Sequence, residues 1–228
     1  MKFVDMNVEY IDHMGSDINV VNAARVSFAK ETKEFDLEKD TKLINYLAKH
    51  NHWSPLAHTS VSIRVKAPIF MARQFVKHQI GLVWNEESRR YIDDTPEFYE
   101  PAEWRSRPEN AKQGSGAGVV EKESLFAGDY YDIPEAYSFV DYCQYSLNLY
   151  NWMLMKNVAP EQARMVLPQN TMTNWIWTGS LVAFARVCKL RLDGHAQKEA
   201  QELAALIHDV VAPLYPVSWK ALMDHMKV

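Results

Sequence analysis

The sequence is poor in cysteine. Only Cys143 and Cys188 occur among 228 residues, and their spacing matches no metal or redox motif, which is typical of a reducing compartment. No segment approaches the length of a membrane-spanning helix, and the N-terminus lacks the basic start and apolar run of a signal peptide. We therefore expect a cytoplasmic protein that does not enter a membrane.

Charge of either sign is not in large excess. The chain has 25 Lys and Arg against 29 Asp and Glu, a net charge of −4, which argues against a surface that coats nucleic acid. His50 and His52 would suit a metal ion, but no cysteine or histidine-rich run accompanies them. We expect no nucleic-acid partner and no metal site, and any basic cluster must be local.

The side chains best suited to ligand binding or catalysis are concentrated between residues 67 and 91. Pro68 fits the first turn of a helix, and Gly81 is placed to end it. An apolar stripe at helical spacing joins them, formed by Ile69, Ala72, Val76 and Ile80. This pattern predicts a helix on which Arg73 lies beside Lys77, and Gln74 beside His78.

The following segment, residues 85–91, has no apolar period and is rich in hydrogen-bond donors and acceptors. It reads Asn-Glu-Glu-Ser-Arg-Arg-Tyr. Guanidinium groups, a hydroxyl and two carboxylates so close together suit a ligand that carries both a phosphate and a hydrogen-bonding base. An amphipathic helix followed by a solvated surface loop explains the same residues equally well from the pattern alone.

The remaining pattern predicts several helices and a few separated strands. Residues 60–67 alternate polar and apolar, which predicts a half-buried strand, and further strands are expected within 1–14 and at 171–178. Helices are expected from Ser16, from Asp36, from Pro134 to Asn157, over 161–167, from Ser180 to Leu192 and from His195. We expect one α+β domain over residues 1–228, with a small, mostly antiparallel sheet.

A glycine cluster at 114–118 lies within a segment rich in Gly, Ser, Asn, Lys and Glu, residues 105–132. Phosphate binding there would need the Lys-Ser/Thr ending of a P-loop and a preceding apolar strand, and both are missing. We expect a mobile loop instead.

Several blocks of the chain resemble flavin-dependent thymidylate synthases, in the same order along the sequence. That family's Arg-His-Arg triplet, followed after seven residues by Ser, corresponds to Lys77-His78-Gln79 and, after eight residues, Ser88. The other similar blocks are Ala23–Phe28, Lys66–Phe70, Ala72–Gln74, Glu161–Arg164 with Val166–Pro168, and Leu190–Asp193 with His195–Gln197. One short block could arise by chance, whereas several in order are far more specific.

The resemblance implies an activity and its partners. The family converts dUMP to dTMP, with methylenetetrahydrofolate as carbon donor and NADPH-reduced FAD as hydride source, in a homotetramer with active sites between subunits. It also implies site residues by motif position. For dUMP these are Gln74, Lys77, Glu86, Glu87, Ser88, Arg89, Arg90, Arg164 and Arg191. For FAD they are His52, Ser54, Lys77, His78, Gln79, Glu86, Ser180, Arg186 and His195.

Arg191 matches the arginine that the family uses to polarise the pyrimidine, which makes it the expected catalytic residue. Carbon–carbon bond formation at C5 of uracil needs an electron-rich ring, and a guanidinium stabilises the negative charge that develops there. Cys143 lies on an apolar stripe, and neither cysteine has a polar, activating setting, so a route without a cysteine nucleophile is consistent. No histidine adjoins Ser88 in sequence, so we expect it to bind the nucleotide rather than attack it.

The chain departs from the family at the flavin side. Lys77 keeps one charge without the guanidinium fork, and Gln79 loses a charge. Ser180, Val182 and Arg186 stand where many members have Asn, Arg and Asn. We expect Arg186 to replace the charge missing at Gln79, with a solvated helix arginine as the equal alternative. A flavin enzyme acting on another nucleotide and a non-catalytic nucleotide-binding protein remain the rival functions.

Overall fold

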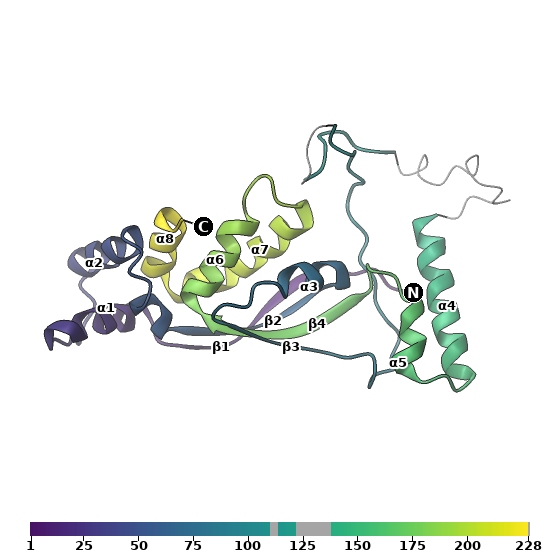
Figure 1. Cartoon of the computed structure of the whole chain (residues 1–228), viewed down its shortest axis with the longest axis horizontal. Coiled ribbons are helices and arrows are strands. Elements are labelled where there is room, and N and C mark those ends of the chain that lie inside the picture. Colours follow the sequence, from purple (N-terminus) through teal and green to yellow (C-terminus); the bar gives the residue numbers. More distant parts are fainter. Residues whose placement is uncertain (110–113, 122–137, 228) are drawn as a thin grey trace. The chain divides into compact units, whose positions relative to one another are not determined.

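A computed structural model describes residues 1–109, 114–121 and 138–227. Within these residues the chain forms eight α-helices and a four-stranded antiparallel sheet of order β1-β2-β4-β3 (Figure 1). In chain order the elements are β1 (Asn7–Met14), α1 (Asp17–Arg25), α2 (Leu37–Lys49), β2 (Ser60–Pro68), α3 (Ile69–Phe75), β3 (Leu82–Glu86), α4 (Phe139–Met155), α5 (Pro160–Ala163), β4 (Met172–Ser180), α6 (Leu181–Arg191), α7 (Lys198–Val211) and α8 (Pro216–His225). The expected α+β class, with helices around a small antiparallel sheet, is confirmed.

The described chain divides into two compact units that alternate along the sequence. The first comprises Met1–Met6, Lys66–Gln74 and Glu86–Asn174, and the second comprises Asn7–Val65, Phe75–Asn85 and Trp175–Val228. Most of the sheet belongs to the second unit. The extent of a single domain over residues 1–228 stays a prediction.

The second unit has its core on one face of the sheet. Val61, Ile63 and Val65 of β2 are fully buried, because alternate side chains of a strand point to the same face. On the neighbouring strand β4, Trp175 and Trp177 are buried at the same period. The alternation read from residues 60–67 therefore predicted both the strand and its buried face.

An aromatic cluster joins four elements of this unit, β3, β4, the end of α3 and α6. Trp84 of β3 stacks on Trp175 with ring centroids 4.2 Å apart, and Trp177 meets Trp84 edge-on at 5.4 Å. Trp177 also contacts Phe75 at the end of α3 and Phe184 of α6, at 6.1 and 5.4 Å. Edge-to-face pairs of this kind stabilise beyond the area they bury. The cluster thus holds the segments on either side of residues 76–81 against α6.

The helices α1, α2 and α8 pack together in the same unit (Figure 1). Buried Asp17, at the start of α1, accepts hydrogen bonds from the backbone N–H groups of Val217 and Ser218 at 3.0 and 2.8 Å. A carboxylate is a favourable partner for the first N–H groups of a helix, so Asp17 caps α8 from elsewhere in the chain.

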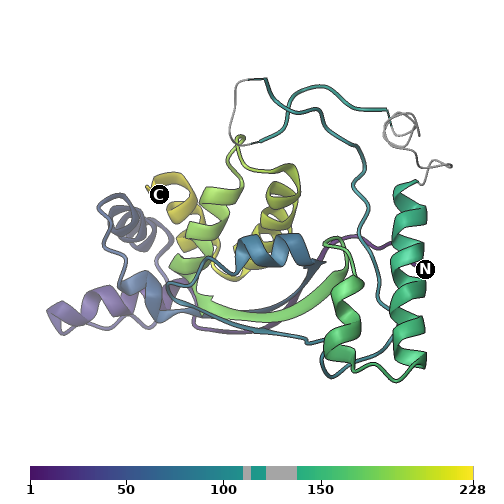
Figure 2. The same ribbon diagram turned by 45° about the vertical axis from the view of Figure 1, so that its right-hand side comes forward.

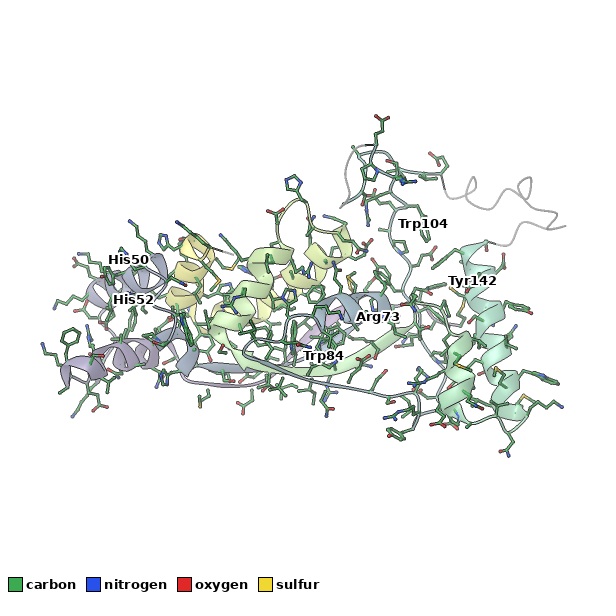
Figure 3. All side chains as sticks on the ribbon, in the orientation of Figure 1. His50, His52, Arg73, Trp84, Trp104 and Tyr142 are labelled. Carbon is green, nitrogen blue, oxygen red and sulfur yellow. The ribbon has the colours of Figure 1, made fainter. Side chains whose placement is uncertain are left out.

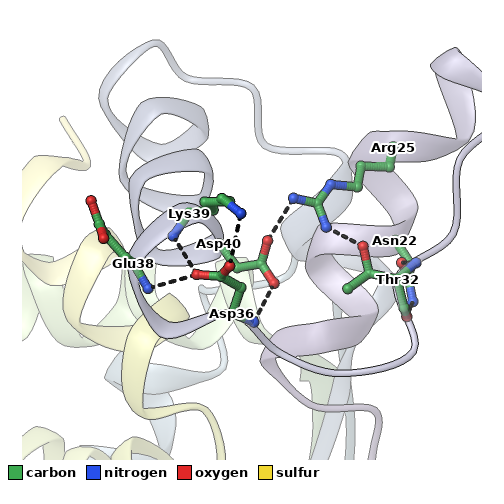
Figure 4. Close-up of polar contacts among 7 residues, drawn as sticks. All are labelled: Asn22, Arg25, Thr32, Asp36, Glu38, Lys39 and Asp40. Carbon is green, nitrogen blue, oxygen red and sulfur yellow. Dashed lines mark hydrogen bonds and ion pairs between the residues drawn. The ribbon is translucent and has the colours of Figure 1, made fainter.

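A buried ion pair fixes the segment between α1 and α2 (Figure 4). Arg25 contacts the fully buried Asp40 at 2.6 Å and also donates to Thr32. Asp40 accepts from the Asp36 backbone N–H at 2.9 Å, and Asp36 caps α2 by accepting from Glu38 and Lys39. These backbone hydrogen bonds, that of Lys39 first, lower the pKa of Asp36. The network explains structurally why an arginine follows Ala23-Ala24.

The first unit has a separate core beneath α4. Cys143, Leu147 and Tyr150 of α4 pack with Phe98 and Ala163, and α4 and α5 run side by side (Figure 2). Lys2 and Lys66 both pair with Glu97, whose pKa these contacts lower, that with Lys2 first. The unit is thus held by apolar packing beneath α4 and by ion pairs at Glu97.

Two predictions for residues 67–91 are wrong. The helix that starts beyond Pro68 ends at Phe75 rather than near Ile80, so Lys77 and His78 do not lie one turn from Arg73 and Gln74. Residues Leu82–Glu86, left without a strand and in part assigned to a loop, form β3. The cause is long-range, because pairing with β4 and the stacking of Trp84 extend this segment. Ile80, expected on the buried stripe, is 79% exposed.

Other boundaries shift by a few residues. The last predicted helix begins at Lys198 rather than His195, and α8 was not predicted. Helix α4 is described from Phe139, and its expected start at Pro134 lies outside the described residues. The expected mobile loop, residues 105–132, lies partly outside them, at residues 110–113 and 122–132. In the part that is described, Arg105 forms an antiparallel bridge with Val119.

Over the described ranges, no helix is long and apolar enough to cross a membrane, and no group of three or more His, Cys, Asp or Glu side chains is arranged to hold a metal ion.

Candidate functional site

A tight turn positions the triplet Lys77-His78-Gln79. The backbone N–H of His78 donates to the Phe75 carbonyl at 2.9 Å, and that of Leu82 donates to the Gln79 carbonyl at 3.2 Å. Gly81 has a φ of +75°, and a Cβ there would lie 3.2 Å from both Ala183 Cβ and Ser180 Oγ. Only glycine combines this backbone conformation with so close an approach to α6. The triplet therefore lies against the start of α6.

Helix α6 begins at a side-chain N-cap. Ser180, the N-cap, accepts a hydrogen bond from the Ala183 backbone N–H at 3.3 Å, and its own N–H donates to the Gly81 carbonyl at 3.1 Å. The prediction of a helix from Ser180 to Leu192 is confirmed within one residue. Ser180 was expected to bind FAD, and its observed role is to fix where α6 starts.

A small pocket lies between the turn and α6. It has a volume of about 120 Å³ and is lined by Lys77, His78, Gln79, Ile80, Leu82, Ala183, Arg186 and Val187. Four of the predicted flavin residues, Lys77, His78, Gln79 and Arg186, thus line one pocket. Two of them are cations, and the rest of the wall is mostly apolar. Such a pocket suits an anionic group attached to a ring or chain of low polarity.

Arg191, the last residue of α6, lies next to His78. Its Nε donates to His78 Nε2 at 3.0 Å, and its guanidinium carbon lies 5.8 Å from the centroid of the Phe75 ring. Burial, and after it the positive charge of Arg191, lowers the pKa of His78 from 6.5 to about 4. Burial also lowers the pKa of Arg191, which remains a cation because its ordinary pKa is so high.

The two carboxylates at the end of β3, Glu86 and Glu87, are anchored to β4. Glu86 accepts a hydrogen bond from Thr173 Oγ1 at 2.8 Å, and Glu87 accepts one from Asn174 Nδ2 at 2.7 Å. The Glu87 backbone N–H also donates to the Asn174 carbonyl at 2.9 Å. Thr173 and Asn174 were missed from the sequence. They lie 87 residues from their partners, and no local pattern signals such a pairing.

Ser88 is bonded to an arginine. Its Oγ accepts from Arg90 Nε at 3.2 Å, while the Arg90 guanidinium carbon lies 4.8 Å from the Tyr91 ring centroid. Arg89 donates to the Asp94 carbonyl at 2.9 Å and pairs with its carboxylate at 3.1 Å. A guanidinium donates to the serine oxygen and cannot accept its proton, so this contact favours binding over nucleophilic attack.

Two atoms of the predicted nucleotide residues are buried without partners. Among the residues that the structure describes, Gln74 Oε1 and Arg89 Nε have no hydrogen-bond partner. Most buried polar atoms are paired, so an unpaired acceptor and an unpaired donor among the residues assigned to the nucleotide are consistent with ligand binding nearby. Arg164 is exposed at the end of α5, where its Nε donates to the Glu161 carbonyl at 3.2 Å.

Five predicted flavin residues do not line the pocket: Glu86 and Ser180, described above, and His52, Ser54 and His195. His52 is exposed and forms a ring cluster with Tyr46 and His50, at 5.8 and 6.4 Å (Figure 3). Ser54 is exposed just before the short 3-10 turn Pro55–His58. His195 is exposed between α6 and α7, and its N–H donates to the Asp193 side chain at 2.8 Å. Their roles toward a flavin remain predictions.

Both thiols are buried, and burial raises the pKa of each. The Cys188 thiol donates to the Ala204 carbonyl at 3.6 Å, and that of Cys143 contacts the Asn170 side chain. A nucleophilic cysteine needs a lowered pKa and an accessible sulfur, so neither thiol is suited to attack.

Comparison with known proteins now adds an independent finding. A family described as "Thymidylate synthase complementing protein" matches residues 9–217. The chain belongs to this family.

Its curated relatives include two proteins named flavin-dependent thymidylate synthase. The one from Thermus thermophilus is 37% identical over 219 residues, which cover 96% of this chain and 76% of that protein. The one from Thermotoga neapolitana is 36% identical over 223 residues, covering 96% and 91%. The resemblance read from the ordered blocks is confirmed.

A solved structure also matches this chain. The crystal structure of a UMP/dUMP methylase, PolB from Streptomyces cacaoi, bound with 5-Br dUMP, matches with a TM-score of 0.83 and 29% identity, covering 98% of this chain and 97% of that one. The similarity thus extends over nearly the whole of both chains.

Proposed function

We propose that this protein is a flavin-dependent thymidylate synthase, which converts dUMP to dTMP with methylenetetrahydrofolate as carbon donor and NADPH as reductant of its FAD. The observation that carries the proposal is the placement of Arg191, the arginine assigned to the pyrimidine, directly against the family's triplet at His78. Family membership over residues 9–217 supports it.

The residues of the pocket fit part of a flavin dinucleotide. Lys77 and Arg186 would neutralise its pyrophosphate, and Ile80, Leu82 and Val187 would cover apolar parts. Drug-sized ligands occupy pockets of about 300–1,000 Å³. A volume of about 120 Å³ therefore admits only a portion of FAD, and the remainder needs residues outside this pocket, for which His52, Ser54, Glu86 and His195 are the motif candidates. Bound and reduced FAD supplies the hydride of the reaction.

The first unit supplies the nucleotide-binding groups in this proposal. The open atoms of Gln74 and Arg89 offer an acceptor and a donor, which match a base edge and a phosphate. Ser88, Arg90 and Arg164 add a hydroxyl and two guanidinium groups. Glu86 and Glu87, held by Thr173 and Asn174, keep this segment extended.

Arg191 is the catalytic side chain in this proposal. Its guanidinium stabilises negative charge on the pyrimidine while C5 attacks the carbon donor. A fixed charge of this kind is effective because it needs no reorganisation as the reaction proceeds. Both thiols are buried and have raised pKa values, so neither is suited to form a covalent bond to the pyrimidine. The proposed route does not use one.

We also propose a homotetramer with active sites between subunits, in the cytoplasm and without nucleic acid. A row of exposed apolar side chains on α4 supports the assembly. It consists of Tyr142, Tyr145, Leu149, Trp152 and Met155, which are between 36% and 77% exposed. Their helical spacing makes one continuous stripe, and exposed stripes of this size are typical of protein interfaces. The net charge of −4 weighs against nucleic acid.

A second candidate is methylation of UMP. The structural relative is named a UMP/dUMP methylase and was also solved with 5-Br UMP, at a TM-score of 0.81 and 28% identity to this chain. The higher identity, 37%, to a protein named flavin-dependent thymidylate synthase favours dUMP.

The test is a direct comparison of the two nucleotides. Purified protein is supplied with FAD, NADPH, methylenetetrahydrofolate and either dUMP or UMP, and products are separated by mass. We expect dTMP from dUMP and FAD release on denaturation. Methylation of UMP alone would favour the second candidate, and a colourless protein that binds dUMP without turnover would favour a non-catalytic binder. Lys198→Ala, an exposed residue of α7, is the matched control.

A further inference from the structure

The hydrogen bond between His78 and Arg191 defines the protonation state of the imidazole. An arginine Nε–H can only donate, so His78 Nε2, 3.0 Å away, must accept and cannot carry a proton. The remaining ring proton then lies on Nδ1. The contact therefore specifies one of the two neutral tautomers of His78.

The surroundings of His78 favour this neutral form. The ring is half-buried, and its pKa is lowered from 6.5 to about 4, by burial first and then by Arg191. The charged side chains that contact His78 or line the same pocket are Lys77, Arg186 and Arg191, which are all cations. Burial and the charge of Arg191 disfavour a positive charge on the ring, so Nε2 keeps its lone pair at neutral pH.

A second ring completes the support of Arg191. Phe75 is fully buried and packs against Trp177 at 6.1 Å, and the Arg191 guanidinium carbon lies 5.8 Å from its centroid. Phe75 and His78 belong to one short segment, and each contacts the arginine. Within the described part of the chain, no hydrogen bond or ion pair involves the terminal nitrogens of Arg191. The rings of Phe75 and His78 thus hold the Nε side of the Arg191 guanidinium, while its terminal nitrogens stay available to a ligand.

We propose that His78 is the positioning residue of Arg191: as the Nδ1–H tautomer, it holds Arg191 Nε so that the terminal nitrogens meet the pyrimidine. The inference rests on the proposed function, because it takes Arg191 as the charge-stabilising group. It gives the histidine of the triplet a role in nucleotide chemistry, in addition to the flavin contact implied by its motif position.

The tautomer can be measured without turnover. In protein labelled with ¹⁵N-histidine, the signals of His78 are assigned by their loss in His78→Gln. We expect the Nδ1–H tautomer in the wild type, neutral down to about pH 4. In Arg191→Met, which removes the guanidinium and keeps an apolar stem, the pKa of His78 should rise. An Nε2–H tautomer in the wild type, or a pKa unmoved by Arg191→Met, would overturn the proposal.

Two substitutions separate positioning from flavin contact. The amide of Gln reaches the place of Nε2, whereas that of Asn reaches only the place of Nδ1. We expect His78→Gln to keep kcat within about threefold and His78→Asn to lower it by up to about 100-fold, the cost of a misplaced catalytic group. The KM for dUMP and the Kd for FAD should change much less than kcat. Equal loss of FAD binding in both variants, with normal kcat at saturating FAD, would make His78 a flavin ligand only.

A double-mutant cycle completes the test. In an Arg191→Ala background, His78→Asn should cause no further loss of kcat, because the group that it positions is gone. A full additional loss would contradict the pairing. If the wild type forms no dTMP, the proposed function fails, and the tautomer measurement still decides whether His78 and Arg191 are paired.

Discussion

The predicted site residues of the second unit and those of the first unit differ in how the protein holds them. In the second unit, Lys77, His78 and Arg186 line a defined pocket, and Arg191 is bonded to His78. In the first unit, Gln74 and Arg89 keep buried atoms without partners, and Arg164 extends from an exposed turn. The first arrangement is preorganised by contacts within the protein, whereas we propose that the second gains its missing bonds from the nucleotide. Preorganised charge suits catalysis, and open bonds suit recognition.

The largest expected effect lies on the preorganised side. Arg191→Ala removes one charge-stabilising donor and should lower the rate of dTMP formation by about 10²–10³-fold. FAD binding should persist, because Arg191 is assigned to the nucleotide. Initial rates at saturating dUMP, with flavin content measured in parallel, check both parts. Turnover near that of the wild type would remove Arg191 from the mechanism.

The next largest effect tests whether Arg186 replaces the positive charge that this chain lacks at Gln79. Arg186→Ala should weaken FAD binding by roughly 10- to 150-fold, equivalent to about 1.5–3 kcal/mol for hydrogen bonds to a charged group. Because Gln79 lines the same pocket, adding Gln79→Arg should restore part of the affinity. Fluorescence titration of FAD measures both variants, with Lys198→Ala as control. An unchanged Kd in Arg186→Ala would mean that this arginine is only a solvated helix residue.

A smaller effect is expected on the nucleotide side. Ser88→Ala removes one neutral hydrogen bond and should weaken dUMP binding by roughly 3- to 10-fold, about 0.5–1.5 kcal/mol, while turnover at saturation continues. Calorimetric titration and kcat together test this. A covalent adduct of Ser88 with the pyrimidine, or complete inactivity with dUMP still bound, would show that the serine attacks.

The smallest effect concerns pH. The pKa of His78 is lowered from 6.5 to about 4 in the folded protein, so between these values the unfolded chain binds more protons. The contribution of His78 to the free energy of unfolding therefore decreases as the pH falls from 6.5 toward 4. In His78→Gln this decrease should be smaller. Denaturant titrations of both proteins across that range test it, and parallel curves would contradict the burial of the ring.

Local signals predicted the parts of the fold that local interactions determine. The alternation of residues 60–67 and the cap at Ser180 were each sufficient for their element, because burial and capping depend on neighbours in sequence. The early end of α3 and the strand β3 were missed. They depend on pairing with β4 and on the stacking of Trp84 against Trp175, which no local pattern encodes.

The candidate site was predictable in composition and not in geometry. Arg186 was predicted to replace the charge lost at Gln79 in contact with the flavin, and the structure shows both residues lining one pocket. The contact of His78 with Arg191 joins residues 113 positions apart and was not foreseen. The apolar wall formed by Ile80, Leu82, Ala183 and Val187 was also missed, since those residues read as helix or core in the sequence.

Formation of dTMP by protein without cysteine tests the central claim most directly. The double variant Cys143→Ala, Cys188→Ala removes both thiols of the chain, and it is incubated with dUMP, methylenetetrahydrofolate and NADPH, with and without FAD. A flavin-dependent thymidylate synthase without a cysteine nucleophile predicts dTMP at a rate near that of the wild type, and only when FAD is present. Loss of dTMP in a variant that still folds and binds FAD, or formation of dTMP without FAD, would contradict the account.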